Sequence, residues 1–466
     1  MVYLDTHLVN KIWCMLGRIK KQLKHSHKNK KGVCHVIAVD MGYGHERPAN
    51  ALKDISHKGE IWVANNYKGI PKKDKEMWTQ GREIYEAISR LKPIPILGHY
   101  IFEAMDRMQQ IPPFYPHRDL SKPTLQLKQQ HAFIKKGLGK HLVEKLAENP
   151  LPLVSTFPLP AFAAETYDYP NDIYLVCTDS DVSRAWVQVD SHRSRIKYFA
   201  PTGRVVERLQ MYGVKRENII HTGFPMAKSL IGGSESTIIK KDLKRRLNTL
   251  DPHRRFFDRY YSTLERQFGK AFCKRQKLKP PTIAFAVGGA GAQKTLGINI
   301  AKSLKALLVK KRMKLILVAG ARKEVASYFH KELKKLKLDK VVEVLYKKER
   351  RAYFTKFDER LRDVDILWTK PSELSFYTGL GIPIIMSPSV GSQEEYNRLW
   401  LGQVGGGIAQ HDEQYTHEWL LDWIESGALA RMAFNGFIEA PTHGIYRIED
   451  AMLGRHSELP PHPMIV

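Results

Sequence analysis

The sequence predicts an α/β protein made of two successive halves, each built around a mostly parallel sheet. Short apolar runs alternate with helix-forming segments over residues 33–232, and the same alternation resumes over residues 281–466. The stretch 233–280 between them is rich in charge and lacks strand patterns, so we expect a basic helical connector there. A chain of 466 residues is long enough for two or three domains of roughly 100–200 residues each.

The chain is strongly basic. It carries 75 Lys and Arg against 48 Asp and Glu, a net charge of +27, which favours a negatively charged partner such as nucleic acid, an anionic membrane surface or a phosphorylated ligand. No apolar run reaches the roughly 18 residues of a membrane-spanning helix and no signal-peptide pattern is present, so we expect a cytoplasmic protein. Neither a disulfide framework nor a zinc motif is indicated by the four scattered cysteines, Cys14, Cys34, Cys177 and Cys273.

Residues 1–32 predict a basic amphipathic helix and a linker. An apolar stripe at helical spacing comprises Leu8, Ile12, Met15, Leu16, Ile19 and Leu23. The remaining faces carry basic residues, Lys11, Arg18, Lys21 and Lys24, and Trp13 lies near an edge of the stripe. This pattern is typical of a helix at a membrane interface, so residues 8–31 are predicted to bind an anionic membrane surface. The alternative is a helix that packs on the body of the protein.

The first half opens with an apolar run at 33–39, which predicts a buried strand. The glycine turn Gly42-Tyr43-Gly44-His45 follows, and a helix is expected from Pro48. The stretch from about 67 to 149 is expected to be a basic helical insertion broken by prolines. Beyond it, the alternation predicts strands at 153–156, 173–177, 197–200 and 219–221, and helices near 161–166 and 203–212.

The second half repeats the pattern. Its strands are predicted at 282–287, 314–318, 341–346, 366–368 and 383–386. Its helices are predicted at 297–309, 321–336, 350–358 and 373–380. We expect the last helices of the chain to pack back on the first half.

Ligands of open α/β sheets bind beyond the carboxyl ends of the strands, at helix N-termini. The turn that contains Gly288, Gly289 and Gly291 occupies such a position, where missing side chains let a phosphate approach backbone N–H groups. The turn matches neither a Walker motif nor GxGxxG, and a tight strand–helix junction is the alternative reading.

Two further clusters begin helices. Ser372 is an expected N-cap with Glu373 in the first turn, which indicates either capping alone or a carboxylate that accepts hydrogen bonds from the two hydroxyls of a ribose. One strand later, Gln393, Glu394 and Asn397 fall on adjacent turns of a helix start, an arrangement suited to binding sugar hydroxyls.

The order of these motifs resembles the glycosyltransferase family 28 group. The quoted segments are the glycine turn ending in His45, the GGAG turn, and the run KPSEL, GLGIPII and GSQEEYN. The group includes monogalactosyldiacylglycerol synthases, bacterial processive diacylglycerol glucosyltransferases and the peptidoglycan N-acetylglucosaminyltransferase. The middle of the chain is similar to the diacylglycerol-type members in Cys177-Thr178-Asp179, Trp186 and the segment 198–225. The resemblance covers roughly residues 33–230 and 280–410.

The resemblance implies a GT-B fold, in which two Rossmann-like domains face each other across a cleft. The nucleotide-sugar donor would bind the C-terminal domain and the acceptor the N-terminal one, with no metal or other cofactor. Carried onto this sequence, it implies that Gly288, Gly289 and Gly291 face the diphosphate, with Ser372 near the phosphates. Glu373 would hold the ribose, and the donor sugar would contact Gln393, Glu394 and Asn397. Gly320 and Arg322 would border the base.

On the acceptor side, the resemblance implies roles for Gly42, Gly44 and Trp186. His45 is the leading candidate for the base that activates the acceptor hydroxyl, with a buried structural histidine as the alternative. The carboxylate candidates are Asp40 and Asp179, each of which would alternatively cap a turn or strand end. Tyr43 and the segment Glu46-Arg47-Pro48 depart from the family pattern, which leaves the acceptor open.

The resemblance therefore implies transfer of a hexose or N-acetylhexosamine from a UDP-sugar to a lipid hydroxyl, with inversion, on the inner face of a membrane. Alternatives are the same donor chemistry on a soluble or polymeric acceptor, and a GT-B-like nucleotide-sugar-binding protein without turnover. A nucleic-acid scaffold would explain the charge but not Glu373, Gln393 and Glu394, so no nucleic-acid partner is expected.

Overall fold

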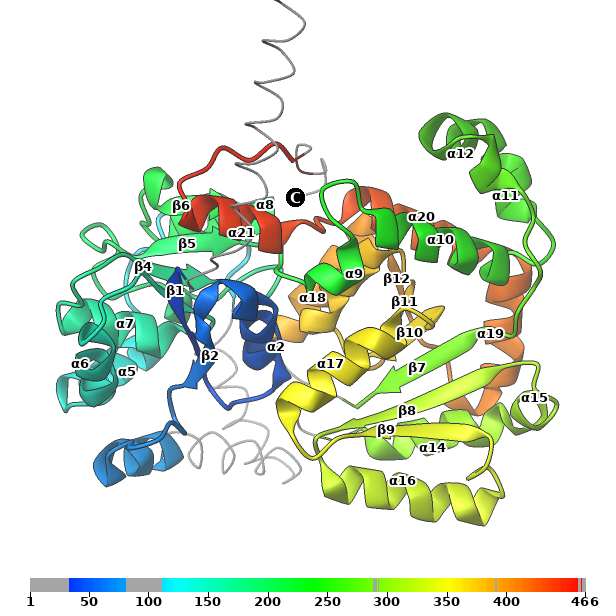
Figure 1. Cartoon of the computed structure of the whole chain (residues 1–466), viewed down its shortest axis with the longest axis horizontal. Helices are drawn as coiled ribbons and strands as arrows, with labels where there is room; N and C mark the ends of the chain where they lie inside the picture. The colour runs from blue at the N-terminus through cyan, green and yellow to red at the C-terminus, as the bar shows by residue number, and fades with distance from the viewer. Residues whose placement is uncertain are drawn as a thin grey trace, which may run out of the picture.

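The computed structural model describes residues 33–80, 111–287, 291, 293–389, 392–459 and 462. The predicted N-terminal helix, together with Gly288 and Gly289, lies outside the described residues. The fold consists of two α/β halves placed side by side (Figure 1).

The first half is built on a six-stranded parallel sheet with the order β2-β1-β3-β4-β5-β6. Its strands are β1 (Cys34–Ala38), β2 (Ser56–Val63), β3 (Leu153–Ser155), β4 (Ile173–Val176), β5 (Lys197–Ala200) and β6 (Ile219–His221). β1, β3 and β4 are buried along their whole length, as expected for parallel strands that are covered by helices on both faces.

The second half is built on another six-stranded parallel sheet, with the order β12-β11-β10-β7-β8-β9. Its strands are β7 (Thr282–Ala286), β8 (Lys314–Gly320), β9 (Val342–Tyr346), β10 (Ile366–Thr369), β11 (Ile384–Met386) and β12 (Gly407–Ala409). Two parallel sheets that face each other confirm the predicted α/β, GT-B-like architecture.

Helices connect successive strands in both halves. In the first half they are α2 (Tyr43–Ala51), η1 (Leu52–Ile55), α5 (Leu125–Lys135), α6 (Lys140–Ala147), α7 (Pro158–Thr166), η2 (Arg184–Trp186), α8 (Gly203–Met211) and η3 (Arg216–Asn218). Between the sheets come α9 (Lys228–Ile231), α10 (Thr237–Leu250), α11 (Arg255–Arg259), α12 (Tyr261–Phe268) and α13 (Lys270–Cys273). The second half has α14 (Lys294–Ser303), α15 (Lys305–Val309), α16 (Lys323–Leu336), α17 (Arg350–Leu361), η4 (Glu373–Leu380), α18 (Ser392–Val404), η5 (Glu413–Tyr415), α19 (Thr416–Glu425), α20 (Ala428–Glu439) and α21 (Gly444–Met452).

Some predicted elements were wrong in extent. The helix expected from Pro48 begins at Tyr43, so the histidine of the glycine turn lies on the helix itself. Residues 111–124 contain no helix, because four prolines fall within this segment, as the predicted interruption of the helical insertion by prolines required, and α5 and α6 follow it. The helix at 373–380 is a 3₁₀ helix, and Ser372 precedes it without a side-chain capping bond.

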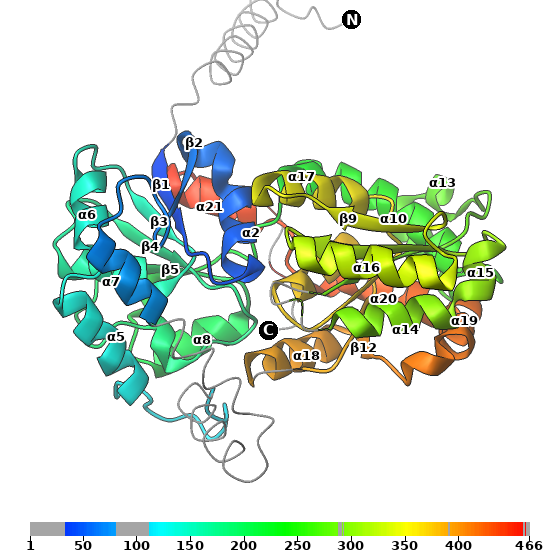
Figure 2. The same ribbon diagram turned by 90° about the horizontal axis from the view of Figure 1, so that it is seen from below.

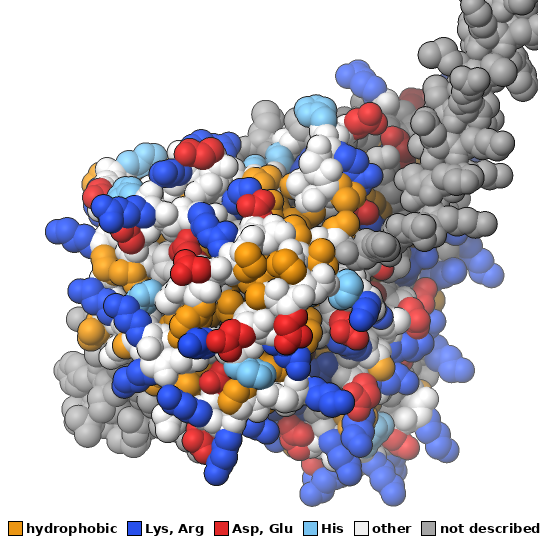
Figure 3. Space-filling model, turned by 60° about the vertical axis from the view of Figure 1, so that its left-hand side comes forward, with side chains coloured by type: hydrophobic (Ala, Val, Ile, Leu, Met, Phe, Trp, Pro, Cys, Tyr) orange, Lys and Arg blue, Asp and Glu red, His pale blue; other side chains and the backbone are white. Residues whose placement is uncertain are grey.

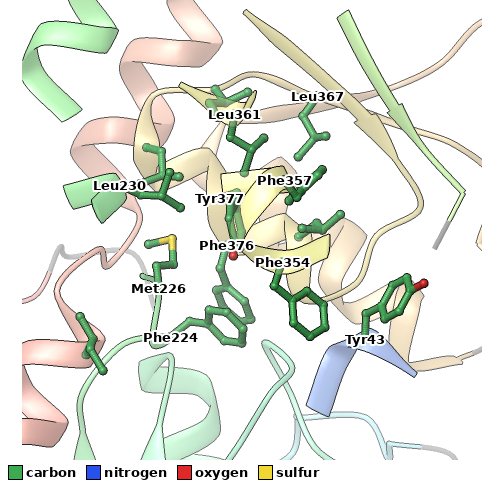
Figure 4. Packing of buried hydrophobic residues seen from close by; sticks show 14 of the residues in the cluster. Tyr43, Phe224, Met226, Leu230, Phe354, Phe357, Leu361, Leu367, Phe376 and Tyr377 are labelled. Atoms are coloured by element: carbon green, nitrogen blue, oxygen red, sulfur yellow. The ribbon is translucent and has the colours of Figure 1, made fainter. Parts of the chain in front are cut away.

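Among the described residues, one of three buried hydrophobic clusters spans both halves, and the other two lie on either side of it. A single buried cluster contains residues of both sheets, including Val36 of β1 and Ile316 of β8. At its centre the rings of Phe224 and Phe376 stack with centroids 4.6 Å apart (Figure 4). The halves are therefore packed together through apolar contacts as well as linked by the chain.

The polypeptide passes between the halves twice. It first leaves β6 for α10, whose Arg246 is buried and donates hydrogen bonds to three carbonyls of the second half, those of Leu361, Val364 and Leu380. It then returns from α20 to α21, which lies against the first half (Figures 1 and 2). Gly444 starts this last helix in close contact with the carbonyls of Gly223 and Phe224, where a Cβ atom would lie 2.4 Å from either oxygen.

Candidate functional site

The glycine turn after β1 directs the first helix toward the second half. Gly42 has φ of +120°, a conformation that favours glycine, and α2 begins at the next residue. α2 contacts α17 and η4 of the second half, as Figure 2 shows for α17. Residues 43–47 are thereby placed at the meeting point of the two halves.

His45 is held on this helix in one tautomer. Its Nδ1 lies 2.9 Å from the carbonyl oxygen of Thr156, so Nδ1–H donates to that oxygen and the lone pair of the neutral ring is on Nε2. The ring packs against Phe157 and Trp186, with centroid distances of 4.8 and 6.1 Å. This burial lowers the pKa of His45 to about 4, so the ring is neutral at pH 7.

Asp179 lies beyond β4 and contacts the opposite half directly. Its Oδ1 accepts a hydrogen bond of 2.9 Å from Nδ2 of Asn397 on α18, while the Oδ1 of Asn397 accepts one of 2.9 Å from the N–H of Ser180. Burial raises the pKa of Asp179 to about 6, and the charges of Glu373 and Glu394 act in the same direction. Asn397, predicted to contact the donor sugar, joins the halves through both its amide nitrogen and its amide oxygen.

Glu373 is the first residue of η4 and is buried where the halves meet. Its Oε1 lies 3.4 Å from Nε of Arg47 on α2, and a Cβ on Gly44 would lie 3.6 Å from its Oε2. The charge of Glu373 raises the pKa values of both His45 and Asp179. The structure therefore brings His45, Asp179 and Glu373 into one electrostatically coupled cluster.

Two other predicted donor residues start α18. Glu394 forms an ion pair with Lys370, which lies directly after β10. Gln393 is half-buried in the same helical turn. Lys370 also lowers the pKa of Asp179, so its ammonium group belongs to the same cluster.

The turn after β8 contacts α2 through Tyr43. The N–H of Ala321 donates a 2.7 Å hydrogen bond to the Tyr43 hydroxyl, and a Cβ on Gly320 would lie 2.4 Å from that oxygen. Gly320 has φ of +69°, so both its conformation and this contact require glycine. Gly291 lies close to Arg322, with 3.4 Å between its ideal Cβ position and Arg322 Cδ.

Asp40 and Ser372 have other partners. Asp40 accepts from Arg350 of α17 at 2.5 Å, and Arg350 also pairs with Glu46. Among the described residues no recorded contact joins Asp40 to His45 or Asp179. The hydroxyl of Ser372 lies 3.4 Å from the carbonyl of Lys370.

Sequence reasoning missed three basic residues of this region. Arg47 and Arg350 reach across from one half to the other, and Lys370 lies among the carboxylates. The only signal for Arg47 was its departure from the family pattern, and Lys370 lay unremarked inside the KPSEL segment. In the parts of the chain that the structure describes, no three His, Cys, Asp or Glu side chains are grouped as metal ligands.

No family model matches the chain. Processive diacylglycerol beta-glucosyltransferase of Bacillus licheniformis is 24% identical over 258 residues, 54% of this chain and 53% of the relative. The protein of the same name from Bacillus cereus strain B4264 is 25% identical over 271 residues, 57% of this chain and 58% of the relative. The chain thus matches little more than half the length of these curated relatives.

Solved structures give a looser likeness. Staphylococcus aureus MnaA with UDP has a TM-score of 0.44 and 14% identity, over 72% of this chain and 84% of that one. MurG of Acinetobacter baumannii has a TM-score of 0.46 and 10% identity, over 90% of this chain and 99% of that one. The matches to the diacylglycerol glucosyltransferases confirm the resemblance to the family 28 group that the motifs predicted.

Proposed function

We propose that the chain is a glycosyltransferase that moves a hexose or N-acetylhexosamine from a UDP-sugar to a hydroxyl of a lipid acceptor. One observation carries the proposal: the carboxyl-end loops of both sheets meet in a single cluster that contains the half-buried His45 and Asp179 and the buried Glu373. The resemblance to processive diacylglycerol beta-glucosyltransferases supports the same donor chemistry and a lipid acceptor.

The second half would bind the donor. Glu373 offers a carboxylate for the ribose hydroxyls, and the N-terminus of α14 offers backbone N–H groups. The departing diphosphate requires positive charge, which Arg322 beside Gly291 and Lys370 after β10 would supply together with that helix end. This mechanism requires no metal.

The first half would bind the acceptor, whose hydroxyl must lose a proton as the new bond forms. His45 is the proposed base, because its Nε2 carries the lone pair and its ring is neutral at pH 7. The negative charge of Glu373 favours the protonated ring that this step creates. Asp179, with a pKa of about 6, is the second candidate, because its pKa is better matched to neutral pH. Inversion at the sugar carbon follows from direct attack.

Residues 8–31 are proposed to hold the enzyme on an anionic membrane surface as a peripheral protein of the inner face. No helix in the described portion of the chain is long and apolar enough to cross a bilayer. On the face drawn in Figure 3, Lys and Arg side chains are spread widely with acidic side chains among them, rather than gathered into one basic block. A localised basic segment such as 8–31 is therefore the better candidate for membrane contact.

The proposal is tested by calorimetric titration of the purified chain with UDP, ADP and GDP in the presence of EDTA. Selective binding of UDP is expected. A second assay supplies UDP-glucose or UDP-N-acetylglucosamine with diacylglycerol in anionic vesicles and measures glycolipid formed. UDP binding without transfer to any lipid would favour a soluble acceptor or a binding protein without turnover, whereas no UDP binding would refute the donor site.

A further inference from the structure

Arg47 is a charged residue buried between the two halves. It lies on α2 one helical turn after Tyr43, so both side chains project from the same face toward the second half. Its side chain is only 4% exposed, although it carries a permanent charge. Such burial requires compensation from the residues around it.

Part of that compensation comes from aromatic rings of the second half. The guanidinium carbon lies 4.6 Å from the ring centroid of Phe357, 5.0 Å from Phe354, 5.6 Å from Tyr353 and 5.9 Å from Tyr377. Three of these rings belong to α17 and the fourth to η4, the helix that Glu373 begins. A planar guanidinium stacks on such rings better than the ammonium of lysine does.

The remaining compensation is polar. Arg47 donates from Nε to Glu373 Oε1 at 3.4 Å and from Nη2 to the Tyr353 hydroxyl at 3.2 Å. Its Nη1 and the Oδ1 of Asp358 are both buried and have no hydrogen-bond partner within the described structure. The charge of Arg47 also lowers the pKa of Asp358, which burial raises to about 6. Arg47 is therefore the counter-charge for two buried carboxyl groups.

We propose that Arg47 is a positioning residue of the donor site, which holds the carboxylate of Glu373 in place from the opposite half. This inference rests on the proposed function, because it concerns the carboxylate that would bind the ribose. Arg47 occupies Oε1 only, while Oε2 lies on the side of Gly44 and keeps its lone pairs for hydroxyl donors. The donor site would thus be complete only when α2 of the first half is seated in the second.

The test uses two ligands that differ only in the groups that Glu373 would bind. UDP and 2′,3′-dideoxy-UDP are titrated calorimetrically into the full chain and into Arg47→Met and Arg47→Lys. We expect Arg47→Met to weaken UDP binding about tenfold or more, because a Glu373 carboxylate that is no longer held by Arg47 loses a hydrogen bond to the ribose hydroxyls. Binding of dideoxy-UDP, which lacks those hydroxyls, is expected to change less than about twofold. Arg47→Lys keeps the positive charge but not the planar guanidinium with its several N–H donors, so we expect it to lose less UDP affinity than Arg47→Met.

Tyr43→Phe is the matched control. It removes another hydrogen bond between the same helix and the second half, but that bond does not involve Glu373. Any effect of Tyr43→Phe should therefore be equal for the two ligands. A double variant, Arg47→Met with Glu373→Gln, should bind UDP no more weakly than Glu373→Gln alone, because both substitutions remove one interaction.

Three results would overturn the inference while leaving the proposed function intact. They are unchanged UDP binding in Arg47→Met, equal weakening for both ligands, and tighter UDP binding, which would mean that Arg47 competes with the ribose. If circular dichroism shows that Arg47→Met does not fold, the same comparison of UDP with dideoxy-UDP is made with Arg47→Lys. Failure of the unsubstituted chain to bind UDP would instead refute the proposed function, and the inference with it.

Discussion

Asn397 and Asp179 join the two halves of the molecule through one side-chain amide. Nδ2 of Asn397 donates to Asp179 at 2.9 Å, and the amide oxygen accepts from the N–H of the next residue, Ser180, at the same distance. Asn397 and Ser180 are buried, so the hydrogen bond between them is shielded from water, whereas Asp179 is half-buried. This pairing fixes how the proposed acceptor side lies against α18.

Asn397→Ala is expected to lower the free energy of unfolding by about 1–3 kcal/mol, because it leaves Asp179 and the Ser180 N–H without their partner in a buried site. Urea denaturation measures this loss. Gln403→Ala, at an exposed position of the same helix, is the control and should change stability little. Equal stability of the two variants would mean that the amide contributes nothing to holding the halves together.

Glu373→Ala is expected to lower stability as well as UDP affinity, because it leaves the buried guanidinium of Arg47 without its carboxylate. The loss should be partly relieved when Arg47→Met is added, since the unpaired charge is then gone. Thermal unfolding of the two single variants and the double variant measures the coupling. Additive losses would contradict a direct interaction between the two side chains.

The stability of the chain should depend on His45 between pH 4 and 6.5. The folded-state pKa of about 4 lies below the ordinary value of 6.5, so the unfolded chain binds the proton more readily in this range and stability falls as the pH is lowered. The difference in free energy of unfolding between the unsubstituted chain and His45→Gln should change by up to about 1.4 kcal/mol per pH unit in this range. His253→Gln, at an exposed histidine, provides the comparison. A parallel pH dependence of all three proteins would contradict the buried neutral ring.

The rate of glycosyl transfer should fall as the pH drops through about 6, because protonation of Asp179 removes its charge from the cluster. This is measured as kcat/KM against pH for the unsubstituted chain and Asp179→Asn. Loss of the limb near pH 6 in the variant would assign it to Asp179. A single limb near pH 4 in the unsubstituted chain would instead leave His45 as the group that controls the rate.

Deletion of residues 1–31 should reduce binding to anionic vesicles and leave UDP affinity unchanged, because the predicted membrane segment is separate from the donor cluster. Vesicle sedimentation with and without phosphatidylglycerol measures the first effect, and calorimetry the second. Replacing Lys11, Arg18, Lys21 and Lys24 by Gln separates charge from apolar insertion. Undiminished vesicle binding after the deletion would place the membrane contact elsewhere.

The fold was predictable from sequence where a strand is buried along its whole length and therefore appears as a continuous apolar run. The apolar run at 33–39 and its glycine turn predicted β1 and the site of α2, and the alternation after 281 predicted five of the six strands of the second sheet. β2 was missed because it lies at the edge of its sheet, where Lys58 and Glu60 face water and interrupt the apolar pattern. β12 was missed for a similar reason, because it is also an edge strand and none of its residues is fully buried.

The candidate site was predictable only as separate halves. Motif order pointed to Glu373, His45 and Asp179, and the structure brings these residues together. The contacts between halves were not predictable, because Arg47 and Glu373 are 326 positions apart and no local pattern encodes their pairing. Asn397 and Asp179 are likewise 218 positions apart.

The two passages of the chain between the halves also restrict how the molecule can open. A single linker would let one half turn in any direction relative to the other, but here β6–α10 and α20–α21 cross side by side, with Gly223 packed on Gly444 and Ser236 Oγ 3.0 Å from His443 Nε2. Two adjacent crossings resist twisting of one half against the other, so bending at this pair of segments is the motion that remains. Cutting the second crossing, near residue 440, would remove this restriction without touching either sheet, and only the first crossing and the packing between the halves would then join them.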